Sequence, residues 1–303
     1  MNQDTESARN TRLGVTAAVA AFGSWGVMPV YFKWIDTVGP LEIVAHRVIW
    51  ALPVLAVFLL VRDGKALFPK LRLPLRTIAW LAVAALLLAS NWLIFVWAVV
   101  NEQVLATSLG YFINPLVNIV LGFVFLKERL TPLQKVAVVI AASGTAYMGW
   151  YLGVAPWVSL SLPLLFGFYG LVRKKLAVGP MTGQMWETIL LLAPCIIYLL
   201  WRNGQGRMDF LHVSASLDAL LLTAGLVTIL PLIWFNTATR YLTLTVVGFF
   251  MYIGPTMSML LAVFLWHEPF TQGHVVAFSA IWTGLVLVSM EQIKNANRRR
   301  RRA

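Results

Sequence analysis

The feature that most constrains this chain is an internal repeat. Residues 24–152 and 164–292 carry one pattern twice, at an offset of about 140 residues and without a gap. The clearest segment pairs Ile-Asn-Pro at 113–115 with Ile-Gly-Pro at 253–255. Repeats of this kind determine the architecture of a whole chain. We therefore predict two equivalent halves, at residues 13–152 and 155–292.

The composition indicates that both halves lie in a membrane. The chain is 59% hydrophobic and 12% charged, about half the charged share of a soluble domain. Its apolar runs have the length of about 20 residues that a helix needs to cross a bilayer, and they do not alternate as barrel strands do. We predict ten spans, at 13–34, 43–61, 77–99, 104–126, 133–152, 155–172, 181–201, 217–238, 244–266 and 273–292.

The basic residues indicate an orientation. With the N-terminus in the cytoplasm, the segments on that side hold about twenty Lys and Arg, and the opposite loops hold only Arg202 and Arg207. This asymmetry follows the positive-inside rule. Five spans per copy reverse the chain direction, so we predict an all-α membrane protein of ten transmembrane helices in two inverted five-helix repeats, with both termini inside. Residues 1–12 are predicted to be a frayed tail.

The net charge of +12 suggests nucleic acid only if it is spread over a soluble face. The basic tail at 293–303 is better explained as a cytoplasmic anchor near anionic lipid headgroups. The chain has no phosphate-binding loop, no HExxH motif and no CxxC pair, and Cys195 is its one cysteine. We therefore predict no nucleic-acid partner, no cofactor, no metal site, no catalytic residue and no enzymatic activity.

Few charged residues lie inside the predicted spans, and each is a candidate for function because a charge at a helix centre costs at least ~2.5 kcal/mol. Arg47 and Glu187 occupy equivalent positions in the two copies. We predict that Arg47 binds an anionic group and Glu187 a cation or a proton. The alternative is that they pair with each other or with nearby carbonyls. His46 either titrates near neutral pH or packs against a neighbour. Lys33 and Arg173 are expected to reach the headgroups.

Span four carries a stripe with a spacing of four residues, formed by Gly110, Asn114, Asn118 and Gly122, and span nine repeats it as Phe250, Gly254, Ser258 and Ala262. Small residues at this spacing let helices approach closely. We predict that spans four and nine pack together or form a homodimer face, with substrate contact by Asn114 and Asn118 as the alternative. Pro115 and Pro255 are expected to kink these spans.

Aromatic residues are abundant, and most are expected at the interfaces or in packing. Trp25, Trp92, Tyr111 and Tyr252 lie in spans rich in small or polar residues, so they are candidates to line a cavity. Glu128 and Glu268 are equivalent, but inversion would place them on opposite sides of the membrane, where they would anchor turns. Thr131 and Gln134 form the pattern of a capping box, and Thr271 is predicted to cap the tenth span.

Residues 112–144 and 252–284 carry Ile-Asn-Pro or Ile-Gly-Pro, then a Glu, a Thr and a Gly. This pattern resembles the EamA-type repeat of the drug/metabolite transporter superfamily. Segments 23–34, 42–50 and 90–99, the last of which contains Asn91, resemble the RarD branch, the chloramphenicol-sensitive permeases. The resemblance implies a bacterial inner-membrane permease that exports small metabolites or drugs from a cavity between its halves, without ATP.

We weigh three functions. A secondary transporter would carry amino-acid-like or chloramphenicol-like solutes by alternating access, with proton coupling if Glu187 or His46 titrates. A membrane enzyme is disfavoured because the spans hold no nucleophile–base cluster. A scaffold or sensor is disfavoured because the chain has almost no soluble domain. We therefore predict a transporter with a small-molecule substrate in the lipid bilayer, and the scaffold or sensor is the alternative.

Overall fold

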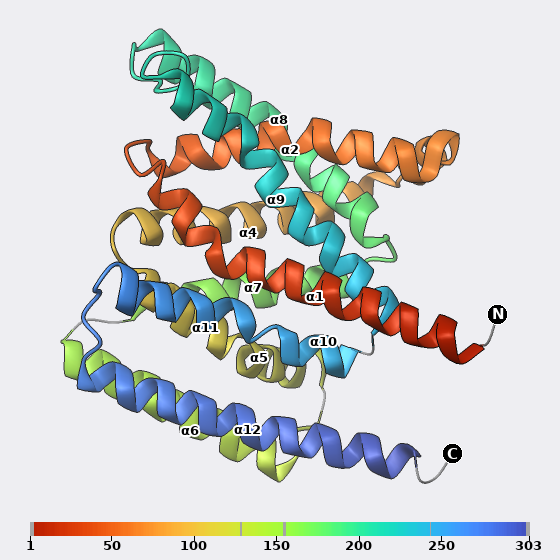
Figure 1. Ribbon diagram of the computed structural model, residues 1–303, viewed down its shortest axis with the longest axis vertical. Helices are drawn as coiled ribbons and strands as arrows, with labels where there is room; N and C mark the ends of the chain where they lie inside the picture. The colour runs from red at the N-terminus through yellow and green to blue at the C-terminus, as the bar shows by residue number, and fades with distance from the viewer. Residues whose placement is uncertain (1–2, 128, 154–155, 243, 301–303) are drawn as a thin grey trace.

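The computed structural model describes residues 3–127, 129–153, 156–242 and 244–300, and within these residues the chain is helical without a strand (Figure 1). The long helices are α1 (Gln3–Lys33), α2 (Pro40–Asp63), α4 (Leu75–Val100), α5 (Val104–Leu126), α6 (Pro132–Leu152), α7 (Trp157–Lys175), α8 (Pro180–Gly204), α9 (Ala215–Tyr241) and α12 (Gln272–Arg300). The short elements are η1 (Gly64–Ala66), α3 (Leu67–Lys70), α10 (Leu244–Phe250), α11 (Ile253–Leu260) and η2 (Leu261–Leu265).

The helices agree with a multi-pass membrane protein. Within the described residues, eight segments are long and apolar enough to cross a membrane. Helices α6 and α7, with 21 and 19 residues, are long enough to cross a membrane but less hydrophobic than these eight segments. All-helical membrane architecture is therefore established, and the count of ten spans stays a prediction.

The helix ends differ from the predicted spans mainly at the N-terminus. Helix α1 begins at Gln3, so most of the segment predicted to be a frayed tail is helical. Helix α12 likewise extends to Arg300, beyond the predicted end of the tenth span. The side chains of the basic tail lie outside the described residues, as does Glu128. The capping box at the start of α6 is confirmed, because Thr131 and Gln134 exchange both hydrogen bonds.

The two equivalent prolines act differently. Pro115 lies inside α5, which is uninterrupted. In span nine the helix breaks between Phe250 and Ile253, and a π-helical turn follows at Leu261–Leu265. Proline has no N–H and its ring clashes with the carbonyl four residues earlier, which for Pro255 belongs to Met251. The predicted distortion of span nine is therefore present, as a break at residues 251–252 just before Pro255.

The helix pairs that pack together follow the internal repeat. Helix α5 packs on α7 and α11 packs on α1, and the offset of about 140 residues exchanges these two pairs. It also exchanges the pair α1–α9 with the pair α7–α4, and the pair α2–α9 with the pair α8–α4. The pairs α6–α12, α2–α8 and α5–α11 are their own equivalents. Figure 1 shows α6 beside α12 at one edge and α2 near α8 at the other.

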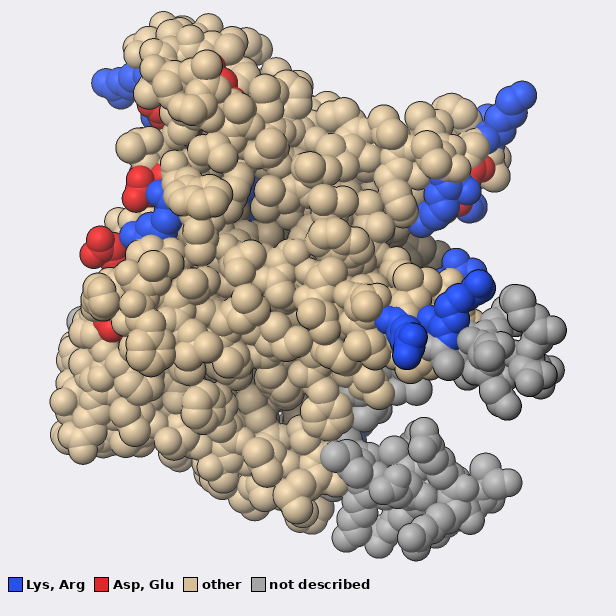
Figure 2. Space-filling view, in the orientation of Figure 1, with Lys and Arg blue, Asp and Glu red and all other residues tan. Residues whose placement is uncertain are grey.

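The two ends of the helix bundle carry different charges. Both termini lie at the same end, together with the loop after α2 (Figure 1). Figure 2 shows Lys and Arg gathered at this end, which we call the basic end, whereas most visible Asp and Glu lie at the opposite end with a few basic residues. On the face that Figure 2 shows, the surface between the two ends is almost free of charge, as expected where lipid hydrocarbon surrounds a protein.

Candidate functional site

Arg47 is the central feature of the candidate site. Its side chain is buried, and its guanidinium lies 4.6 Å from the ring centroid of Trp92 and 5.1 Å from that of Phe32. Its Nε donates a hydrogen bond of 3.1 Å to Thr228 Oγ1, and its Nη1 has no hydrogen-bond partner among the described residues. None of the carboxylates in the described residues lies within 4.0 Å of the Arg47 guanidinium. Cation–π contacts partly compensate its buried charge.

His46 precedes Arg47 and contacts aromatic neighbours. Its Nδ1 accepts a hydrogen bond of 3.1 Å from the indole of Trp50, and its ring lies 4.7 Å from that of Phe210. Its Nε2 is buried and has no hydrogen-bond partner among the described residues. His46 thus packs against its aromatic neighbours with one ring nitrogen bonded and the other without a partner among the described residues, and its role in titration stays a prediction.

Phe210 belongs to the loop at 205–214, which is fastened to α2 by Glu42. The Glu42 carboxylate is fully buried, and it accepts hydrogen bonds from the backbone N–H groups of Asp209 and Phe210. It also forms an ion pair of 2.8 Å with Arg202. A charge-assisted set of this kind is strong because it is shielded from water. We call this attachment the distal latch, since it lies at the end opposite to the basic end.

Glu187 lies in a second charged cluster, at α8. Its carboxylate is fully buried, lies 3.5 Å from Arg173 Nε, and accepts a hydrogen bond of 3.3 Å from the Tyr169 hydroxyl. The Arg173 guanidinium passes directly over Gly183, where a Cβ would collide with it. Arg173 therefore turns toward Glu187, and the expectation that it extends to the headgroups is wrong. Lys33 reaches Glu102, at 4.0 Å.

Arg47 and Glu187 do not pair with each other. Val48, beside Arg47, packs in one cluster with Leu191 and Cys195 of α8. Glu187 lies one to two turns away from that level, or roughly 6–12 Å along the helix axis. The pairing that we considered from the sequence is thus replaced by one between Glu187 and Arg173, because α2 and α8 meet with their equivalent positions at different depths.

The loop after α2 makes the counterpart of the distal latch. Trp186, which is equivalent to His46, donates its indole N–H to the carbonyl oxygen of Leu71 over 3.1 Å. Leu71 belongs to the loop at 64–74, at the basic end. Lys70 of this loop pairs with Asp63, the last residue of α2, at 3.1 Å. We call the contact between Trp186 and Leu71 the basic-end latch.

The asparagine residues differ in their surroundings. Asn91 donates its amide to the carbonyl of Leu162 over 2.8 Å and so joins α4 to α7. Asn114 is buried, and its Oδ1 has no hydrogen-bond partner among the described residues. Asn118 is exposed and lies against Gly167 of α7. Asn114 thus has a buried polar atom without a partner among the described residues, which a bound solute would satisfy.

The small-residue stripes pack within the chain. Gly110 lies against Ser159 of α7, and Gly254 lies against the backbone of α1, where Ser258 also bonds to Gly26. Spans four and nine still touch, because Ser108 donates to the carbonyl of Pro255 over 2.7 Å. Their predicted contact is therefore confirmed, although the stripes themselves face α7 and α1. A homodimer through spans four and nine stays a prediction.

The three remaining aromatic candidates are half-buried and have aromatic neighbours. Trp25 packs on Phe22 and Phe235 with ring centroids 5.3 and 5.9 Å apart. Tyr111 lies edge-on to Phe95 at 5.8 Å, and Tyr252 stacks on Phe112 at 6.3 Å. Their part in solute binding stays a prediction.

Glu268 caps a helix of the other half. Its two carboxylate oxygens accept hydrogen bonds of 2.8 Å from the backbone N–H groups of Val104 and Leu105, at the start of α5. A negative charge is favourable at a helix N-terminus. Burial raises the pKa of the Glu268 carboxyl, and the two amide donors act in the opposite direction. The predicted role as a structural anchor fits this geometry.

Sequence reasoning missed several residues of these clusters. Phe32 and Thr228 contact Arg47, Tyr169 contacts Glu187, and Glu42 and Phe210 form the distal latch. Glu42 had a detectable signal, because it precedes His46 by one helical turn at the start of an apolar span. The others carry no mark that separates them from the many aromatic and hydroxyl residues of the spans.

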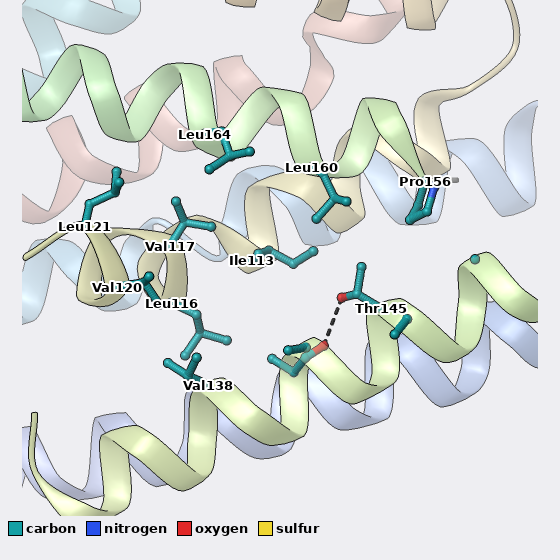
Figure 3. A pocket seen from close by; sticks show the side chains of 14 residues that line it. Ile113, Leu116, Val117, Val120, Leu121, Val138, Thr145, Pro156, Leu160 and Leu164 are labelled. Carbon is teal, nitrogen blue, oxygen red and sulfur yellow. Dashed lines mark hydrogen bonds between the residues drawn. The ribbon is translucent and has the colours of Figure 1, made fainter. Parts of the chain in front are cut away.

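A separate apolar groove of about 370 Å³ lies between α5, α6 and α7 (Figure 3). It is not at Arg47 or Glu187. Its lining comprises Ile113, Leu116, Val117, Val120, Leu121, Val138, Ala141, Ala142, Thr145, Ala146, Gly149, Pro156, Leu160 and Leu164.

The duplicated architecture and the polar residues inside it match a known family. The model of the EamA-like transporter family matches the chain twice, at residues 12–150 and 155–290. The chain belongs to the EamA-like transporter family. It is 43% identical to "Protein RarD" of Escherichia coli K12 over 96% of this chain and 98% of that protein. It is 41% identical to an "Uncharacterized transporter" of Vibrio cholerae over 98% of each.

Further relatives extend this assignment. The chain is 30% identical to "Chloramphenicol-sensitive protein RarD" of Pseudomonas aeruginosa over 95% of this chain and 97% of that protein. A crystal structure with 17% identity superposes with a TM-score of 0.58, covering 93% of this chain and 98% of that chain, which supports the fold alone. The predicted resemblance to RarD-type EamA transporters is confirmed, and the chain is a membrane transporter of small solutes rather than an enzyme.

Proposed function

We propose that this EamA-family chain is a secondary-active permease of the bacterial inner membrane that exports small organic solutes by alternating access. The carrying observation is Arg47, a buried cation among aromatic rings with no carboxylate in reach among the described residues. An uncompensated buried charge costs several kcal/mol. A solute with an anionic group would supply the missing partner, and the Trp92 and Phe32 faces would hold its apolar part.

Alternating access requires two halves that rock about this site. The proposed architecture is two inverted five-span halves, with the basic end in the cytoplasm. Two observations support it. The packing pairs exchange under the offset of about 140 residues, and the charged ends differ as Figure 2 shows.

The two latches would act as the gates. The distal latch closes the far end over His46, one residue from Arg47, through Glu42 and Phe210. The basic-end latch holds the loop at 64–74 over Trp186, one residue from Glu187. Equivalent positions in the repeat thus contact opposite gates. Release of one while the other stays closed would expose the site to one side at a time.

Glu187 is the proposed coupling residue. It has one cation within 4.0 Å among the described residues, Arg173, at a separation longer than a strong ionic hydrogen bond. Protonation of Glu187 would release Arg173 from this attraction. Proton binding at Glu187 would then be coupled to the opening of the basic-end latch.

Counterflow across liposomes that contain the purified protein tests the transport activity. Labelled amino acids and chloramphenicol form the panel, the latter because of the name of the Pseudomonas aeruginosa relative. We expect saturable exchange of at least one solute, abolished in Arg47→Ala and strongly reduced in Arg47→Lys, since lysine lacks the planar group that stacks on aromatic rings. The exposed Arg76→Ala is the matched control.

Normal counterflow in a correctly inserted Arg47→Ala variant would refute the assignment of the binding residue. A separate measurement imposes a pH gradient on the same liposomes. Flux that does not respond to the gradient would reject proton coupling through Glu187.

A further inference from the structure

The groove between α5, α6 and α7 lies apart from Arg47 and Glu187. Its lining side chains are apolar except for Thr145, whose hydroxyl donates to the carbonyl of Ala141 over 2.9 Å (Figure 3). The lining therefore offers no free hydrogen-bond donor from a side chain to an occupant. A polar solute would lose its hydration without compensation there, whereas a hydrocarbon chain would not.

The groove opens on the outer surface of the helix bundle. Leu160 and Leu164, which line it, are 38% and 42% exposed. Helix α7 packs on α4 and α5, which are both candidate spans, so these side chains lie at the depth of the membrane. The lining extends over Val138–Gly149 of α6, or roughly 16 Å along the helix axis. The groove is thus an elongated slot that faces lipid tails.

The slot lies where the first copy has smaller side chains than the second copy at equivalent positions. Val138 and Ala142 line it on α6, and the equivalent residues on α12 are Phe278 and Trp282. Phe278 is fully buried, and its ring lies 5.8 Å from that of Trp282. The second copy therefore carries two large rings, of which Phe278 is buried and Trp282 is 41% exposed, where the first copy carries two smaller side chains.

Basic residues lie beyond one end of the slot. Lys135 stands one helical turn before Val138, and Lys127 follows Leu121 by six residues, so both are within roughly 5–9 Å of the lining along their helices. Both lysines are exposed. Basic pockets beside transmembrane helices bind anionic lipid headgroups.

We propose that this groove binds an anionic phospholipid of the bilayer, with one acyl chain in the slot and the headgroup phosphate on Lys127 and Lys135. The proposal rests on the membrane topology of the proposed function, but it does not require transport. Both parts of the ligand are needed: the slot selects an alkyl chain, and the two lysines select a negative headgroup over a zwitterionic one.

Native mass spectrometry of the full-length protein tests this. The protein is purified in detergent and equilibrated with equal amounts of dioleoyl-phosphatidylglycerol and dioleoyl-phosphatidylcholine, and the retained lipid is counted. We expect the wild type to retain phosphatidylglycerol preferentially. Lys135→Gln and Lys127→Gln should each lower its retention by about fivefold, without a change for phosphatidylcholine. Lys65→Gln, at the same end but away from the groove, should have no effect.

The slot itself is tested by filling it. The double variant Val138→Phe/Ala142→Trp introduces the residues of the second copy, and it should lose the retained phospholipid. Val139→Phe makes the same change as Val138→Phe at the next residue, which is 63% exposed, and it should behave as the wild type. Equal retention in the filled variant and in Val139→Phe, or no headgroup preference in the wild type, would overturn the proposal. If the filled variant fails to fold, the lysine variants decide. Because this experiment measures lipid retention and not transport, its result is independent of the counterflow assay. The lipid site can be refuted while transport is shown, and transport can be refuted while the lipid site is shown.

Discussion

The ion pair between Arg173 and Glu187 supplies the sharpest stability prediction. Arg173→Met removes the cation and leaves Glu187, which is fully buried, with the Tyr169 hydroxyl as its one side-chain donor among the described residues. Arg173→Met/Glu187→Met removes both charges and keeps side chains of similar length. The two variants therefore separate the cost of an isolated buried charge from the loss of the pair.

The magnitude follows from burial and distance. Removal of one partner of a buried pair costs about 3–5 kcal/mol, while replacement of both by apolar residues is often nearly neutral. The separation of 3.5 Å and the remaining Tyr169 contact favour the lower value. We expect a loss of about 3 kcal/mol for Arg173→Met, which at roughly 2 °C per kcal/mol lowers the Tm by about 6 °C. The double variant should return to within about 2 °C of the wild type.

Thermal unfolding in detergent, followed by tryptophan fluorescence, measures these shifts. The control is the double-mutant cycle with Arg47→Met and Glu187→Met, which lie apart along α2 and α8 and should therefore add within about 0.5 kcal/mol. A double variant as unstable as Arg173→Met would refute the reasoning, because removal of the isolated Glu187 carboxylate would then restore no stability. Strong coupling between Arg47 and Glu187 would refute the observed depths of the two helices.

Three further predictions address packing, capping and the distal latch. Gly225→Ala should lower the free energy of unfolding by about 1–3 kcal/mol, because its Cβ would collide with the backbone of α2. Gly170→Ala, with open space around its Cβ, should leave the stability unchanged or raise it, and equal Tm values for the two variants would contradict this. Glu268→Gln should cost about 1 kcal/mol by weakening the cap of α5, so an unchanged Tm would argue against a capping role. Glu42→Gln should speed amide hydrogen exchange in the loop at 205–214 by roughly tenfold, since charged hydrogen bonds are worth about 1.5–3 kcal/mol, and unchanged exchange at Asp209 would exclude the latch.

Local and periodic signals explain how much of the fold was predictable. The boundaries of α5 agree with the predicted span at 104–126, because long apolar runs end at polar or turn-forming residues. The capping box of Thr131 and Gln134 was predictable because its hydrogen bonds join residues three apart. The break before Pro255 follows from the missing N–H of proline. At the site, Arg47 and Glu187 could be selected because charges inside apolar spans are rare.

The partners of those charges were not predictable. In a soluble helix the apolar stripe marks the buried face, but in a membrane the lipid-facing and the buried faces are both apolar. The rotation and depth of each helix therefore leave little trace in the residue pattern. For this reason the sequence suggested a possible pair of Glu187 with Arg47, whereas the neighbour of Glu187 is Arg173. For the same reason it did not reveal Glu42 and Phe210.

The sequence by itself determined the duplication, the membrane environment, the approximate spans and the EamA-family membership, because these follow from the order and composition of residues along the chain. The tertiary structure alone decided which rings surround Arg47, which loop covers His46, and where Val138 and Ala142 leave a groove. Those features depend on how helices from both copies meet in space. Shape complementarity between packed side chains, more than polarity, determines that arrangement inside a bilayer.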